Sequence, residues 1–107
     1  MTYELDPDAD LPPHLLQLFL RSAPVQLAVL VEAATRHNVD SARLAAHKFK
    51  GGLFAAGASP LAQDVETLRI TLAREEWANV ERQLRAIRDD FARLVSELER
   101  RLEAKES

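Results

Sequence analysis

Residues 40–57 read DSARLAAHKFKGGLFAAG, and this stretch determines how the rest of the chain is interpreted. On a helix that turns about 100° per residue, His47 falls on one face and the apolar residues fall on the opposite face. The pattern therefore predicts an amphipathic helix, capped by Asp40 and stopped by Gly57, with His47 exposed in its middle. The residues expected on the buried face are Ala42, Ala45, Phe49, Gly52, Leu53 and Ala56.

The segment before this helix predicts another one. It runs from about Pro12 to His37 and repeats leucine, valine and phenylalanine at helical spacing, with Asp10 placed to cap it. Pro24 interrupts the pattern, and proline in a helix interior removes a hydrogen bond and produces a kink or a break. We therefore expect a kink or break near Ser22, which would leave a short N-terminal lid helix ahead of a longer one.

Two more helices are expected after Gly57. Ser59 and Pro60 have the residue types that favour a cap and a first helical position. The segment from about Trp77 to Glu103 repeats apolar residues every three or four positions over six turns. Short turns between long helices predict an all-α fold, an antiparallel up-and-down four-helix bundle. Residues 1–107 would form a single domain, with residues 1–10 as a tail and residues 104–107 frayed.

Composition excludes several classes of function. The chain has 107 residues, a hydrophobic fraction of 47%, a net charge of −3 and no cysteine. It offers no thiol chemistry and no basic stripe for a nucleic acid backbone. No apolar signal core is visible at the N-terminus, and charged or amide residues interrupt the longest apolar stretches. We expect a soluble, cytoplasmic monomer that binds neither nucleic acid nor membrane.

His47 has a chemically suggestive setting. On the predicted helix, Arg43 lies one turn before it, Lys50 and Gly51 lie one turn after it, and Phe54 lies two turns after it. A glycine in a helix interior costs roughly 1 kcal/mol relative to alanine, so Gly51 on an exposed face calls for a reason. An unperturbed imidazole has a pKa of about 6.5 and is largely a neutral nucleophile at pH 7. Lys50 would supply donors to phosphoryl oxygens, and Gly51 would leave space for them.

The stretch Ala46-His47-Lys48-Phe49-Lys50-Gly51, followed by Gly57-Ala58 and Leu61, resembles the signature of histidine phosphotransfer (HPt) domains. The resemblance implies a relay in which His47 takes a phosphoryl group from the aspartate of one receiver domain and passes it to another. The receiver, in a response regulator or a hybrid histidine kinase, would supply the Mg²⁺. No cofactor, metal site or autonomous ATP-dependent kinase activity is expected in this chain.

In such domains a polar side chain from the next helix often supports the histidine. Gln63, Glu66 and Arg69 are the candidates here, with Arg69 preferred because a cation suits a phosphoryl group. Arg43 is expected to add attraction at longer range.

Contacts with a partner are less sharply indicated. Leu11, Leu15, Lys48 and Phe54 are candidates for a docking patch, although packing in the core or under the lid helix is equally compatible for the apolar members. Lys48 is also compatible with an ordinary solvated charge. Two other functions stay open at this point: an adaptor or inhibitor that docks on a receiver or kinase without carrying phosphate, and a homo-oligomeric helical protein.

Overall fold

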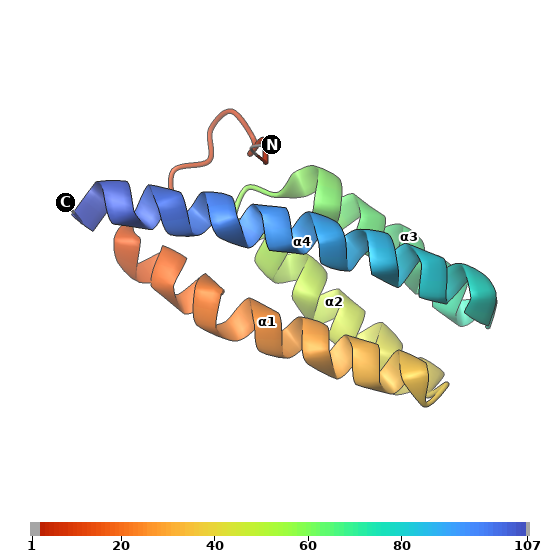
Figure 1. The fold of residues 1–107 in the computed structure, drawn as a ribbon. Helices are drawn as coiled ribbons and strands as arrows, with labels where there is room; N and C mark the ends of the chain where they lie inside the picture. Colours follow the sequence, from red (N-terminus) through yellow and green to blue (C-terminus); the bar gives the residue numbers. More distant parts are fainter. Residues whose placement is uncertain (1–2, 107) are drawn as a thin grey trace.

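The computed structural model describes residues 3–106, and these residues contain four helices and no strand. The helices are α1 (Pro13–Thr35), α2 (Val39–Ala55), α3 (Ser59–Ala73) and α4 (Trp77–Glu106). Three-residue turns join them, and the chain reverses at each turn, as the colour order in Figure 1 shows. Each helix packs against two others, in the cycle α1, α2, α3, α4 and back to α1. The result is an elongated bundle of 46 × 22 × 19 Å.

The core follows from the apolar face of each helix. In α2, the residues expected on the inner face are buried except Gly52, which is half-buried, and Ala46 joins them. Phe49 of α2 is fully buried and meets the ring of Phe91 from α4 edge-on, with 5.3 Å between the ring centroids. Phe19 of α1 approaches Phe91 from another side at 6.3 Å. These rings therefore join three of the four helices at the centre of the bundle.

The expected break at Pro24 is absent, and no separate lid helix occurs in residues 3–106, because α1 continues through the proline. Pro24 is exposed, so water can hydrate the carbonyl oxygen that its missing N–H leaves without a helical partner. Ala23 and Leu27 on either side of it are buried against the bundle. Tertiary packing thus keeps both halves of α1 in one helix.

The helix caps also differ from the expected ones. Asn38, not Asp40, caps α2, and its side-chain oxygen accepts a hydrogen bond from the Ser41 N–H at 3.2 Å. Ala58 precedes α3 in the cap position without a side-chain bond, so Ser59 already lies inside the helix. Asp10 does not cap α1; it forms an ion pair with Lys105 of α4 at 2.6 Å.

Gly57 ends α2 as predicted, and it does so in the left-handed conformation, with φ +81°. A Cβ placed on Gly57 would lie 2.3 Å from the Cβ of Ala9. The Gly57 carbonyl accepts a hydrogen bond from the Asp6 N–H at 2.8 Å, and the Ser59 hydroxyl donates to the Asp6 carboxylate. Asp6 and Ala9 of the N-terminal tail are therefore held against the α2–α3 turn, whereas residues 1 and 2 lie outside the described residues.

The C-terminal end is more ordered than expected. Residues 104–106, which were expected to fray, belong to α4. Lys105 binds Asp10, and Glu106 accepts a hydrogen bond from the Gln17 side chain at 2.8 Å. These contacts link the last turn of α4 to the tail and to α1. Ser107 lies outside the described residues.

By length and composition alone, α1 meets the criterion for a membrane-spanning helix, with a mean hydropathy of 1.4 over 18 residues. From the sequence alone, we expected no stretch apolar and long enough to span a membrane. Core helices of soluble proteins pass the same test, and the inner face of α1 packs into this bundle. The side chains that raise its hydropathy on the outer face are Leu15, Leu18, Val25 and Val29.

Candidate functional site

His47 lies in the middle of α2 with its side chain exposed, as the helical pattern predicted. It is held there because Ala46 and Phe49, its neighbours on the inner face, are fully buried. Gly51, one turn later, is exposed, and a Cβ added there would meet nothing within 4 Å. The surface beside the imidazole is therefore open to an approaching molecule.

Gly52, by contrast, does not need to be glycine for packing. A Cβ at this position would lie 3.6 Å from the side-chain oxygen of Gln26 and 3.9 Å from the ring of Phe19, which are ordinary contact distances. An alanine would therefore fit at this position without displacing α1.

Lys50 is engaged across the helix interface. Its ammonium nitrogen lies 2.7 Å from Oε2 of Glu66 on α3, and its side chain is only 19% exposed. Arg69, one turn after Glu66, places Nη1 at 2.8 Å from the same carboxylate oxygen and 3.1 Å from Oε1. The three side chains form a cluster, here called the Lys50–Glu66–Arg69 cluster, between α2 and α3.

The hydrogen bonds within this cluster favour the ionised form of Glu66. The hydrogen bond from Lys50, followed by that from Arg69, holds the pKa of Glu66 below its usual value. Arg69 is also constrained by burial, since its Nε is buried without a hydrogen-bond partner. The cluster thus carries two cations and one anion between α2 and α3, and its member Lys50 lies one turn after His47 on α2.

The structure separates the other predicted site residues into two groups. Arg69 joins the cluster, and Glu66, named as a weaker candidate, lies at its centre. Gln63 is exposed, and its side chain forms no hydrogen bond within residues 3–106. Arg43 and Lys48 are exposed on α2 and form no ion pair within the same residues. The pairing of Lys50 with Glu66 depends on how α2 and α3 are aligned along their axes. The periodicity within one helix does not predict this alignment.

Exposed apolar side chains lie on both α1 and α2. Leu15 and Phe54, both candidates for partner contact, are 39% and 46% exposed, and Leu11 is half-buried. Leu11 and Leu15 line a groove of about 180 Å³ between α1 and α2, and Lys48 lines a second one of about 440 Å³. The sequence reasoning missed other exposed apolar side chains on these helices: Leu18, Val25, Val29 and Leu44.

Phe54 does not pack beneath a lid helix, because residues 3–106 contain none and its ring remains exposed. Its position on α2, two turns after His47, places it on the same face of the helix. A role in partner contact therefore fits this residue better than a role in packing.

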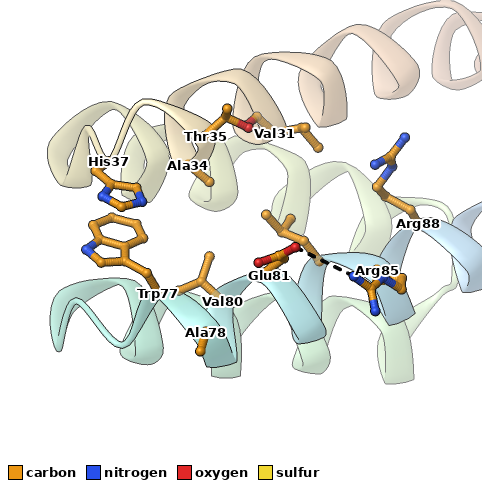
Figure 2. Close-up of a pocket in the computed structure, with 11 residues that line it drawn as sticks. Val31, Ala34, Thr35, His37, Trp77, Ala78, Val80, Glu81, Arg85 and Arg88 are labelled. Carbon is orange, nitrogen blue, oxygen red and sulfur yellow. Dashed lines mark hydrogen bonds and ion pairs between the residues drawn. The ribbon is translucent and has the colours of Figure 1, made fainter.

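A pocket of about 650 Å³ lies elsewhere, between α1 and α4. Figure 2 shows one end of it, where the rings of His37 and Trp77 stack face to face at 4.0 Å, and the other end, where Arg85 and Arg88 lie. None of the predicted site residues lines it. Within residues 3–106, no group of three or more histidine or acidic side chains has the arrangement of a metal site.

The comparisons with known proteins identify one family. Searches of curated proteins and of solved structures gave no match. A family model, described as the Hpt domain, matches residues 14–104, which include His47 and nearly all of the four helices. Because the match covers most of the chain, this protein belongs to the Hpt domain family of two-component phosphorelays.

Proposed function

We propose that this chain is a histidine phosphotransfer protein and that His47 carries the phosphoryl group between receiver-domain aspartates. The observation that supports this most directly is the setting of His47, which is exposed in mid-helix beside the open position of Gly51. The up-and-down antiparallel bundle would act as a rigid single-domain support for the imidazole, with no ATP site of its own.

The transfer step uses the neutral imidazole as the nucleophile. One ring nitrogen attacks the phosphorus of the receiver's aspartyl phosphate, the N–P bond forms, and the P–O bond to the carboxylate breaks. The carboxylate leaves with the bonding electrons, and the other ring nitrogen loses its proton to water. The reverse sequence delivers the group to a second receiver.

The charges around His47 fit this role. The phosphoryl oxygens need hydrogen-bond donors, and Lys50 lies one turn away on the same helix. Arg43 and Lys48 are exposed cations that would attract a phosphorylated, acidic partner surface at longer range. The receiver would bring the Mg²⁺.

A docking surface for the receiver would consist of the exposed apolar residues beside His47. Leu15 and Phe54 are its members from the sequence, with Leu11 at its edge, and Leu44 of α2 adds a side chain that is 57% exposed. Exposed apolar patches of this kind mark contact sites in soluble proteins. A cytoplasmic monomer is the form in which this surface would stay accessible.

The test is phosphotransfer from a receiver domain that carries a radiolabelled phosphoryl group, followed by separation of the two proteins. We expect a base-stable, acid-labile label on the wild-type chain and none on His47→Gln. His14→Gln is the matched control, because His14 is exposed on α1 and outside the site, and it should be labelled like the wild type. Label on His47→Gln would refute the assignment.

A further inference from the structure

Glu66 occupies an unusual place with respect to the proposed site. Its carboxylate contacts two cations at 2.7 and 2.8 Å, and one of them, Lys50, lies one turn after His47 on the same helix. The side chains of Lys50 and Arg69 are 19% and 24% exposed, so neither moves freely in solvent. The carboxylate of Glu66 therefore fixes the positions of both cations.

A phosphoryl group on His47 would change the balance in this cluster. Two cations and one anion leave one unit of positive charge, whereas a phosphoryl group brings up to two negative charges. An ammonium group has three donors, so Lys50 can turn one of them toward a phosphoryl oxygen while another stays on Glu66. Glu66 and the phosphoryl group would then share the same cations and repel each other.

We propose that Glu66 is a positioning residue that holds Lys50 and Arg69 beside His47 before phosphorylation and competes with the phosphoryl group for them afterwards. The inference rests on the proposed function and assigns to Glu66 the control of how strongly His47 holds its phosphoryl group. A phosphotransfer protein must release the phosphoryl group that it accepts. A competing carboxylate weakens the hydrogen bonds from the cations to the phosphoryl oxygens.

The state of Glu66 at working pH agrees with this role. Because the hydrogen bonds from Lys50 and then Arg69 keep the pKa of its carboxyl below the usual value, Glu66 stays ionised throughout the neutral range. The competition is therefore present whenever the imidazole is neutral enough to act as a nucleophile.

The test uses Glu66→Gln, which removes the charge and keeps the shape, and phosphoramidate as a donor that needs no partner protein. The imidazole nitrogen attacks phosphorus, the P–N bond of the donor breaks, and ammonia departs while the ring releases its proton. The amide oxygen of Glu66→Gln can still accept a hydrogen bond from Lys50, but it carries no charge to compete with the phosphoryl group. We therefore expect labelling of Glu66→Gln to be about two to five times faster than that of the wild type, the range that the strength of partly exposed ion pairs allows. The acid dissociation constant of the phosphoryl group, followed by ³¹P NMR, should rise by a similar factor.

Two variants serve as controls. Glu66→Asp keeps the charge and should behave like the wild type. Glu32→Gln removes an exposed glutamate of α1 that pairs with Arg36, outside the site, and should also leave both measurements unchanged.

The outcomes separate the two proposals. If His47 is labelled but Glu66→Gln matches the wild type in both measurements and loses only stability in urea, Glu66 merely joins α2 to α3 and the inference is wrong. If wild-type His47 takes no label from phosphoramidate or from a receiver, the proposed function fails and the inference fails with it.

Discussion

Replacing Gly57 with alanine should destabilise the fold for two separable reasons. Gly57 has φ +81°, and a left-handed conformation costs an alanine about 1 to 2 kcal/mol. The new methyl group would also lie 2.3 Å from the Cβ of Ala9, so the tail must move away. That movement breaks two hydrogen bonds, the one from the Asp6 N–H to the Gly57 carbonyl and the one from the Ser59 hydroxyl to the Asp6 carboxylate. Each such bond is worth about 0.5 to 1.5 kcal/mol, which brings the expected loss to about 2 to 5 kcal/mol.

A double-mutant cycle separates the two contributions. Ala9→Gly removes the methyl group that clashes with the new side chain of the Gly57→Ala variant, and the tail can return to the turn. The combined Gly57→Ala and Ala9→Gly variant should regain the stability lost with the hydrogen bonds, about 1 to 3 kcal/mol. The loss of stability that comes from the backbone angle should remain. In the wild-type background, Ala9→Gly relieves no such clash and should change stability little.

The assay is urea unfolding followed by far-ultraviolet circular dichroism, which reports on all four helices. Gly51→Ala is the matched control, because Gly51 is helical, exposed and free of contacts, so alanine should stabilise the chain by about 1 kcal/mol. The reasoning is refuted if Gly57→Ala costs less than about 1 kcal/mol or if Ala9→Gly has the same effect in both backgrounds. Labelling of His47 by phosphoramidate should persist in folded Gly57→Ala, since this glycine acts on the fold.

Three further predictions follow from other contacts. Phe49→Ala should lower the free energy of unfolding by about 3 to 5 kcal/mol in urea titrations, because Phe49 is fully buried against Phe91, and a loss below about 1.5 kcal/mol would contradict this packing. Arg100 and then Arg101 lower the pKa of Glu97 from 4.5 to about 2, so the stability it contributes is present above pH 4.5 and is lost as the pH falls toward 2. At neutral pH, wild type should be more stable than Glu97→Gln by about 1 kcal/mol, because solvent around the exposed arginine screens the ion pair. This difference in the free energy of unfolding should shrink as the pH falls over that range. A difference that stays constant would exclude this role. His37→Ala should shift the emission of Trp77, the sole tryptophan, to longer wavelength by exposing its stacked face, whereas unchanged emission would argue against the stack.

The sequence predicted the elements that depend on local pattern. The positions of all four helices followed from apolar spacing, and Gly57 was recognised as a helix end because few other residues tolerate a left-handed angle. The exposure of His47 followed in the same way, since 100° per residue places it opposite the apolar face that contains Phe49.

The features that were missed depend on tertiary structure. Asp40 and Asn38 are both acceptable caps by residue type, and only the path of the preceding turn selects Asn38. Pro24 predicted a break, and burial on both sides of it kept the helix whole. The contact of the tail with Gly57 and the pairing of Lys50 with Glu66 join residues far apart in sequence, whose register no local pattern specifies.

The apolar character of α1 on two faces has a consequence for synthesis of the chain. This helix leaves the ribosome before the other three, and by hydropathy alone it resembles a membrane segment. Its neighbour α2 follows after a turn of three residues, and at ribosomal rates its 17 residues are added in about one to four seconds. An α1–α2 hairpin can therefore cover the inner leucines of α1 before α3 and α4 have emerged. The order of the helices thus shortens the time in which the nascent chain could be captured by membrane or chaperone.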